Sequence, residues 1–130
     1  MEKKQLILLI DDDEIHLEIA KNILKSKYEI ITAKSGKNAL EVLIKGTTPN
    51  LILLDILMPN MDGWETFNRI RGISLLKDVP IVFLTSLNEK AEKERAREMG
   101  ASDFITKPFQ TDDMLKRIEI AINKQGKKNC

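Results

Sequence analysis

Five short apolar runs recur along the chain, and they constrain its fold more than any other feature. They span residues 6–10, 28–32, 51–54, 81–84 and 104–105. Residues that are apolar at consecutive positions have no polar face to turn toward water, so such runs are typical of strands in a sheet that is covered on both faces. Stretches with helical periodicity separate the runs. This alternation predicts a doubly wound α/β fold with a parallel sheet and right-handed crossovers.

The first two intervening stretches predict helices over about residues 13–26 and 36–45. Ser35 precedes the second helix and is a suitable N-cap, because its hydroxyl can accept from a backbone N–H group of the first turn. Apolar residues at helical spacing are expected to line the inner faces: Ile19, Ala20, Ile23 and Leu24 in the first helix, and Ala39, Leu40, Leu43 and Ile44 in the second.

Three more helices are indicated by residues that begin or end helices. Asp62 is followed by Glu65 three residues later, the form of a capping box, which predicts a third helix. Asn88 is expected to cap a fourth helix that ends at Gly100, and Thr111 is expected to begin a fifth. The charges of the fourth helix suggest a solvated face, or a surface for a partner. The inner face of the fifth helix is expected to consist of Met114, Leu115, Ile118, Ala121 and Ile122.

Length and composition predict one folded domain over residues 1–130. Apolar residues make up 42% and charged residues 32%, as in ordinary globular proteins. The 21 basic and 20 acidic residues give a net charge of +1, so no long-range field draws the chain to nucleic acid or to a membrane. Cys130 is the single cysteine, which excludes an internal disulfide. The first apolar run is too short for a signal peptide or a membrane span, and a cytoplasmic location is expected.

Polar residues follow four of the five apolar runs. Asp11, Asp12 and Asp13 come after the first run, Asp55 after the third, Thr85 and Ser86 after the fourth, and Lys107 and Pro108 after the fifth. Each of these residues alone is also typical of a turn or a cap. In a doubly wound sheet, however, the carboxyl ends of the strands meet at one edge, where ligands bind. Their joint placement therefore predicts a functional site.

The residue types at this edge indicate phosphoryl chemistry with a metal ion. Carboxylates brought close together either take up a proton or bind a cation, and a few oxygen ligands supplemented by water suit Mg²⁺. A lysine and a hydroxyl can donate hydrogen bonds to phosphoryl oxygens. A carboxylate can also act as the nucleophile and form an acyl phosphate. Neither histidine nor cysteine is clustered in a way that indicates zinc.

Four stretches closely resemble the successive signatures of response-regulator receiver domains. They are residues 9–13, 53–63, 83–86 and 100–109, in the family's order and spacing. The resemblance covers about residues 5–124, with residues 125–130 as a tail. It implies a five-stranded sheet in the order 2-1-3-4-5 with five helices.

The resemblance also implies a phosphoacceptor and a metal site. Asp55 would accept the phosphoryl group. Mg²⁺ would be bound by Asp55, by Asp12 directly, by Asp11 largely through water, and by the backbone carbonyl of Leu57. Asp13 would have a minor role in charge or capping.

Further implications concern phosphoryl contacts and the switch. Thr85 and Lys107 would contact the phosphoryl oxygens, and the Lys107–Pro108 bond would be cis. Thr85 would move toward the phosphoryl group and Phe104 would turn inward behind it, changing an output surface on the fourth helix, fifth strand and fifth helix. Phe104 would otherwise be ordinary core. The output partner is unknown, and a homodimer on phosphorylation is possible.

The phosphoryl donor would be a sensor histidine kinase or a histidine phosphotransfer protein. Such a chain catalyses its own phosphorylation and dephosphorylation and is not a conventional enzyme. Docking would involve the first helix and the loop after Lys107: Ile15, His16, Pro108 and Phe109. His16 is expected to be a partly exposed helix residue rather than a metal ligand. Leu57 and Leu87 offer no group to orient a water molecule, which predicts slow self-dephosphorylation.

Two other functions fit the sequence less well. A phosphatase of the haloacid-dehalogenase type would need Asp-x-Asp followed by threonine, but Glu14 and Ile15 follow the aspartates here; turnover of a phosphate monoester would favour it. A receiver fold kept only for contacts usually lacks the acids, the acceptor or the lysine, and all are present. No helix-turn-helix or basic stripe predicts DNA binding. The sequence does not identify the kinase or the oligomeric state, or whether the chain acts alone or within a longer protein.

Overall fold

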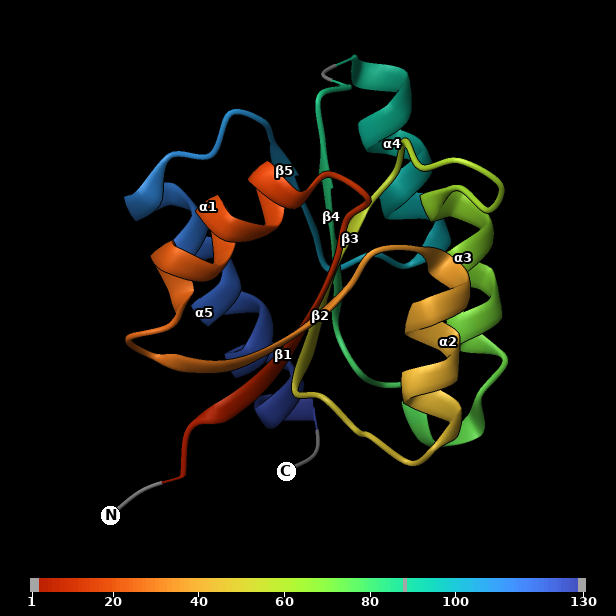
Figure 1. Ribbon diagram of the computed structural model, residues 1–130, viewed down its shortest axis with the longest axis horizontal. Coiled ribbons are helices and arrows are strands. Elements are labelled where there is room, and N and C mark those ends of the chain that lie inside the picture. Colours follow the sequence, from red (N-terminus) through yellow and green to blue (C-terminus); the bar gives the residue numbers. More distant parts are fainter. Residues whose placement is uncertain (1–2, 88, 129–130) are drawn as a thin grey trace.

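The structure is a computed structural model that describes residues 3–87 and 89–128. Its sheet has five parallel strands in the order β2-β1-β3-β4-β5, as predicted (Figure 1). The strands are β1 (Gln5–Ile10), β2 (Tyr28–Ala33), β3 (Leu51–Asp55), β4 (Ile81–Thr85) and β5 (Asp103–Thr106). Each apolar run of the sequence therefore forms a strand.

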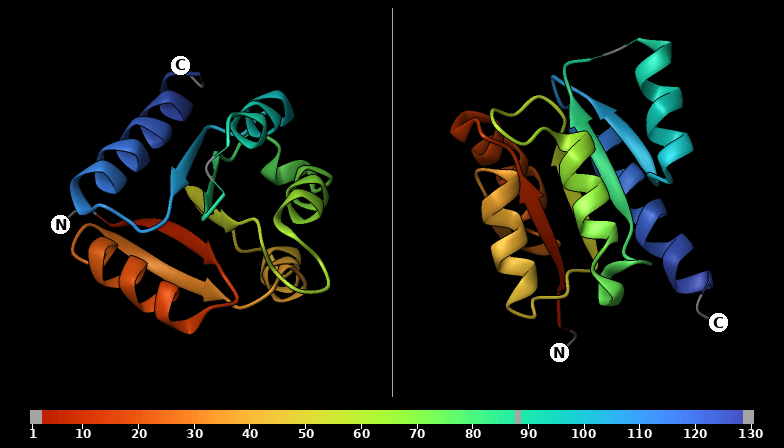
Figure 2. Two further views of the ribbon diagram at one scale, coloured as in Figure 1. Left: turned by 90° about the horizontal axis from the view of Figure 1, so that it is seen from above. Right: turned by 90° about the vertical axis from the view of Figure 1, so that its right-hand side faces the viewer.

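Helices cover both faces of the sheet. They are α1 (Glu14–Leu24), α2 (Gly36–Ile44), α3 (Gly63–Arg71), α4 (Lys90–Met99) and α5 (Thr111–Lys128), and a short 3-10 helix, η1 (Ser74–Leu76), precedes β4. Helices α1 and α5 lie on one face, and α2, α3 and α4 lie on the other (Figure 2). Among the described residues, no helix combines the length and the apolar character that a membrane span requires.

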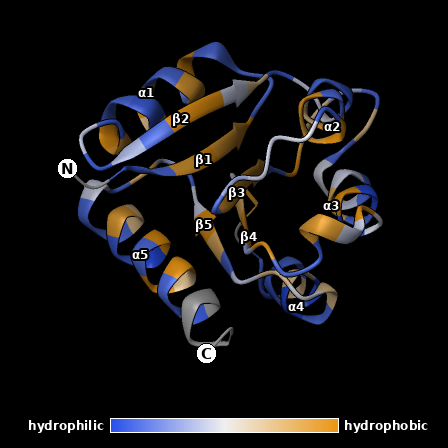
Figure 3. Cartoon of the chain, turned by 90° about the horizontal axis from the view of Figure 1, so that it is seen from below, coloured by the Kyte–Doolittle hydropathy of each residue, from blue (hydrophilic) through white to orange (hydrophobic). Residues whose placement is uncertain are grey.

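Alternate residues of the central strands bury their side chains on opposite faces of the sheet. In β1, Ile7 and Leu9 pack with α1 and α5, whereas Leu8 and Ile10 pack on the side of α2 and α3. All four are fully buried. Burying one such side chain stabilises the fold by about 1.5–3 kcal/mol, which explains why consecutive positions are apolar. Figure 3 shows hydrophobic residues along the central strands and hydrophilic residues along much of the surrounding helices.

Side chains cap three of the helices. The Asp13 carboxylate accepts from the backbone N–H groups of the first turn of α1, with Asp13 Oδ1 2.8 Å from the nitrogen of Ile15. Ser35 accepts from a backbone N–H in α2, and Asp62 accepts from the backbone N–H of Glu65 in α3, as predicted. The reciprocal half of the capping box is absent from the described contacts, because the Glu65 carboxylate accepts from Arg69 instead.

The ends of α4 and α5 also bear on the predictions. Gly100 ends α4 with a φ of 96°, the left-handed conformation that favours glycine, and Thr111 begins α5, as predicted. The prediction that Asn88 caps α4 lies outside the described residues. The buried residues of α5 include Met114 and Ile118, in agreement with the expected inner face.

Two predicted inner faces were partly wrong. In α1 the buried residues are Leu17, Ala20 and Leu24, whereas Ile19 is 44% exposed. Positions three and four apart share one face of a helix, and Ile19 lies about 200° around the axis from Leu17. In α2, Ile44 is 73% exposed, and it lies about 100° around the helix axis from the buried Leu43. Helix α1 also ends at Leu24 rather than at residue 26.

Candidate functional site

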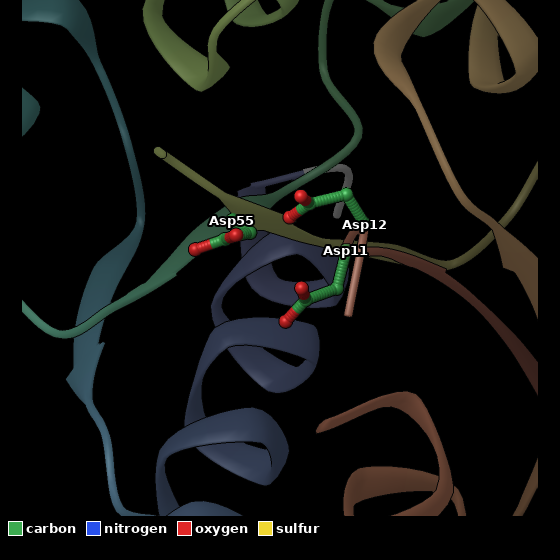
Figure 4. Close-up of side chains that lie close together, drawn as sticks. All are labelled: Asp11, Asp12 and Asp55. Carbon is green, nitrogen blue, oxygen red and sulfur yellow. The ribbon is translucent and has the colours of Figure 1, made fainter. Parts of the chain in front are cut away.

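Three carboxylates meet beyond the carboxyl ends of β1 and β3. Asp55 is the last residue of β3, and Asp11 and Asp12 directly follow β1. Because these strands are neighbours, with Ile10 paired to Leu54, the residues that follow them lie side by side. One oxygen of each of the three carboxylates lies within 4.8 Å of the others (Figure 4). The sheet register therefore creates the acidic cluster that the sequence predicted.

Burial and mutual repulsion disfavour the charged form of Asp55. Its residue surface is 4% exposed and that of Asp11 is 1% exposed, whereas Asp12 is exposed. Burial, followed by the nearby charge of Asp11, raises the pKa of Asp55 to about 7, although the Lys107 ammonium opposes the shift. At neutral pH the site therefore holds a proton readily, or a cation in its place.

Lys107 brings an ammonium group into the acidic cluster. Its Nζ atom lies 2.7 Å from Asp11 Oδ2 and 3.3 Å from Asp55 Oδ1, and its side chain is 9% exposed. The Lys107–Pro108 peptide bond is cis. The backbone N–H of Lys107 donates to the carbonyl of Thr85, so the ends of β4 and β5 are joined beside the acids.

Thr85 ends β4 at the same edge of the sheet and is fully buried. Its Oγ1 atom accepts from the backbone N–H of Leu87 at 3.0 Å. A hydroxyl that accepts one hydrogen bond retains its own proton for donation, so Thr85 can still serve as a donor. Thr85 is therefore placed at the correct edge, but its hydroxyl is turned toward the loop before α4.

Leu57 and Phe104 are the two apolar residues among the predicted site residues. Leu57 is in the loop between β3 and α3, and its side chain is largely exposed. Phe104 lies in β5 opposite Phe83 of β4 and is half-buried against the core on the α4 side. It also lines a cavity of about 660 Å³ between α4 and α5.

Gly63 fixes the start of α3 against the end of β3. A Cβ atom at this position would lie 2.4 Å from the carbonyl oxygen of Asp55 and 2.6 Å from Cα of Ile56. The Gly63 N–H donates to the carbonyl of Ile56 at 2.7 Å. Only glycine allows this approach, so the backbone that carries Asp55 is held directly by α3.

His16 contacts Lys107 of the site, and the sequence did not predict this contact. The side chain is partly exposed, as predicted, but Nδ1 lies 2.9 Å from Lys107 Nζ. The two residues are 91 positions apart, and a single histidine on a helix carries no signal of such a contact. Lys107 lies in the loop between β5 and α5, and the packing of α1 against α5 brings this loop beside the first turns of α1.

The donor set fits a hard divalent cation such as Mg²⁺. Three carboxylates opposed by one ammonium leave an excess of negative charge when all are ionised, and burial makes this excess costly. Carboxylate oxygens are the ligands that Mg²⁺ prefers, and the exposed Asp12 leaves room for water on the open side. Among the described residues, no other group of acids, histidines or cysteines is arranged to hold a metal ion.

Comparisons with known proteins agree on one family. Residues 7–119 match the family model described as the response regulator receiver domain. The two-component response regulator ORR6 of Oryza sativa subsp. japonica is 37% identical over 111 residues, which cover 83% of this chain and 65% of that protein. The regulator ycf27 of Porphyra purpurea is 33% identical over 126 residues, which cover 96% of this chain and 50% of that protein.

The fold is similarly matched by solved structures. Chemotaxis protein CheY4 of Vibrio cholerae superposes with a TM-score of 0.86 at 28% identity, covering 92% of this chain and 99% of that one. The chain spans about half to two thirds of the length of the two curated relatives above.

Proposed function

Because this chain belongs to the response regulator receiver domain family of two-component signalling, we propose that Asp55 accepts a phosphoryl group from a phosphohistidine. The donor would be a sensor histidine kinase or a histidine phosphotransfer protein. The observation that carries the proposal is the meeting of a buried carboxylate, two further acids and a lysine ammonium at the carboxyl ends of the strands.

Mg²⁺ is the cofactor that this set of residues would hold. Asp55 and Asp12 would bind it directly, Asp11 largely through water, and the backbone carbonyl of Leu57 would complete the protein ligands. When bound, the ion would neutralise negative charge on the phosphoryl oxygens. The excess of carboxylates over ammonium at the site supports this assignment.

In the transfer step, an oxygen of Asp55 attacks phosphorus while the bond from phosphorus to the histidine nitrogen breaks. Lys107 and the hydroxyl of Thr85 donate hydrogen bonds to the phosphoryl oxygens, which carry the developing charge. Attack by water later returns the Asp55 carboxylate and inorganic phosphate. The chain thus promotes its own phosphorylation and dephosphorylation and is not a conventional enzyme.

Phosphorylation would change the surface formed by α4, β5 and α5. Thr85 would turn from Leu87 toward the phosphoryl group, and Phe104 would move inward. Helix α4 is suited to such a shift because few contacts hold it. Its N-cap residue Glu89 makes no side-chain capping bond, and Ala96 is the one residue of Lys90–Met99 that is buried. The cavity beside Phe104 indicates that side chains there have room to rearrange.

The exposed surfaces of the chain support two further proposals about partners. We propose that Ile15, His16, Pro108 and Phe109 form the docking surface for the phosphoryl donor. An output partner, or a second copy of the chain, would bind at the α4-β5-α5 surface. We further propose a cytoplasmic location and a single receiver domain over residues 1–130, with a core at about 5–124.

The test is phosphorylation of the purified protein by acetyl phosphate in the presence of Mg²⁺, followed by intact-mass spectrometry. One added phosphoryl group is expected in the wild type and none in Asp55→Asn, which preserves shape but removes the nucleophilic carboxylate. Beryllium fluoride, a mimic of the phosphoryl group, should bind the wild type alone. If the wild type gains no phosphoryl group, or if Asp55→Asn gains one equally well, Asp55 is not the acceptor.

A further inference from the structure

The Lys107 ammonium has acceptors on three different elements. Its Nζ atom lies 2.7 Å from Asp11 Oδ2 after β1, 2.9 Å from His16 Nδ1 in α1, and 3.3 Å from Asp55 Oδ1 at the end of β3. An ammonium carries three N–H donors and no acceptor. His16 Nδ1 must therefore accept, which places the proton of the neutral ring on Nε2.

Local structure holds the His16 ring in this position. Asp13 caps α1 and accepts from the backbone N–H of His16 at 3.3 Å, which fixes the first turn of the helix. The ring contacts Phe109 edge to face, with their centroids 6.4 Å apart. The His16 side chain is 37% exposed and that of Lys107 is 9% exposed, so the ring reaches from the surface to a nearly buried charge.

We propose that His16 is a positioning residue for phosphoryl transfer, a neutral acceptor that holds the Lys107 ammonium in place while the carboxylates change partners. This inference rests on the proposed function. A cation bound by Asp11 and Asp55, or a phosphoryl group on Asp55, would take carboxylate oxygens away from the lysine. His16 would not change, so one N–H of the ammonium would stay anchored while another turns toward a phosphoryl oxygen.

The neutral character of the imidazole matters for this role. A third carboxylate at this position would hold the lysine too, but its charge would repel the incoming phosphoryl group. An imidazole nitrogen accepts the hydrogen bond without adding negative charge. The contact thus positions the lysine and leaves its positive charge available to the transferring group.

Two substitutions separate the acceptor from the shape of the side chain. In His16→Asn, the amide oxygen is bonded to Cγ as Nδ1 is, so it can accept from Lys107 at nearly the same place. His16→Leu retains a branched side chain at Cγ but offers no acceptor. Glu18→Ala serves as the control, because Glu18 is an exposed residue of the same helix.

The rate of phosphorylation by acetyl phosphate at saturating Mg²⁺ is the primary measurement. This small donor requires no docked protein, so any role of His16 in docking does not contribute. We expect His16→Leu to react about tenfold more slowly than the wild type, as the loss of one charge-assisted hydrogen bond implies. His16→Asn and Glu18→Ala should react within about twofold of the wild type. The Mg²⁺ concentration that gives half the maximal rate should be the same in all four proteins.

Several results would overturn the inference. His16→Leu reacting at the wild-type rate or faster would show that the contact is not used, and an equal loss in the leucine and asparagine variants would show that the acceptor is not the cause. A wild type that takes up no phosphoryl group would instead contradict the proposed function itself. The two failures are therefore distinguishable.

A second measurement needs no variant of His16. His16 is the only histidine of the chain, so its ring nitrogens can be observed by NMR without assignment. At about pH 8, where histidine rings are ordinarily neutral, we expect the proton on Nε2 and a change in the Nδ1 resonance when Lys107 is replaced by Met. A proton on Nδ1, or an Nδ1 resonance that is the same in Lys107→Met, would overturn the inference even if His16→Leu failed to fold.

Discussion

At the scale of single residues, two opposing effects act on the pKa of Asp55. The fold buries its carboxylate beside Asp11, which raises its pKa, while Lys107 partly offsets the repulsion. A group held in this way is costly to ionise until a cation arrives. If Mg²⁺ binds as proposed, it would relieve this electrostatic cost, and the site would respond to the ion for that reason.

This penalty predicts how stability depends on pH. The raised pKa means that the folded protein retains a proton on Asp55 that the unfolded chain loses near its ordinary value of 3.8. The contribution of this proton to the stability of the fold is fully present below pH 3.8 and is lost as the pH rises through about 7. Asp55→Asn removes the cost of ionisation. At about pH 8 without Mg²⁺, its free energy of unfolding, measured with urea, should exceed that of the wild type by about 1–3 kcal/mol. Near pH ~4 the difference in the free energy of unfolding between the variant and the wild type should largely vanish. A difference of equal size at both pH values would show that ionisation of Asp55 is not its cause.

Leu57 and Leu87 predict a long-lived phosphoryl group. Leu57 is 54% exposed and lies two residues beyond Asp55, and we expect its side chain to border the phosphoryl group. An apolar side chain cannot orient the attacking water. We expect the phosphorylated protein to decay over minutes or longer, and Leu57→Asn to decay severalfold faster, as followed by the release of inorganic phosphate. Decay of the wild type within seconds would exclude this explanation.

At the scale of elements, the junction between β3 and α3 places the acceptor. Asp62 caps α3, and Gly63 lets the helix start against the backbone of Asp55 and Ile56. The sequence predicted the cap, because a capping residue acts within one turn. A glycine after the cap also indicates that the backbone near Asp55 is approached closely, and the structure adds which atoms of Asp55 and Ile56 are approached, because these depend on how the two elements pack.

Gly63→Ala tests this junction. The added Cβ would meet backbone atoms at 2.4 and 2.6 Å, and backbone cannot move aside as a flexible side chain can. We expect a loss of about 2 kcal/mol or more in the free energy of unfolding and a slower phosphorylation by acetyl phosphate. Gly72→Ala at the other end of α3 is the matched control, since its Cβ would come no closer than 3.3 Å to the carbonyl oxygen of Arg69. Equal effects of the two substitutions would show that the approach at Gly63 is unimportant.

The packing of helices against the sheet explains why two predicted inner faces were partly wrong. Apolar residues at helical spacing identified α1 and α2, yet Ile19 and Ile44 are exposed. A short helix with extra isoleucines is consistent with more than one inner face, and only packing against the sheet selects one. The contact between His16 and Lys107 was not predicted for a related reason, since it depends on the position of α1 relative to the loop between β5 and α5.

At the scale of the whole molecule, the sheet order determines the site. Strands β1, β3 and β4 are consecutive neighbours, and residues that follow them lie together although they are far apart in sequence. The apolar runs therefore predicted the fold, and the polar residues behind them predicted the acidic cluster. The distances and the burial of Asp11 required the structure, because they depend on side-chain packing.

Mg²⁺ should stabilise the whole molecule through this one site. A ligand that binds only the folded state adds about 2.7 kcal/mol at one hundred times its dissociation constant. We expect Mg²⁺ to raise the thermal unfolding temperature of the wild type and to have a much smaller effect on Asp12→Asn, which removes one proposed ligand at an exposed position. Asp78→Asn is a suitable control, because Asp78 is an exposed acid in the loop before β4. An equal rise in all three proteins would indicate binding elsewhere.

The most direct test of the central claim is a crystal structure of the protein with Mg²⁺ and beryllium fluoride. We expect beryllium fluoride on an oxygen of Asp55, Mg²⁺ held with Asp11 and Asp12, and hydrogen bonds from Thr85 Oγ1 and Lys107 Nζ to fluorine. Beryllium fluoride on a different carboxylate, or a site in which Lys107 and Thr85 point away from it, would contradict the account.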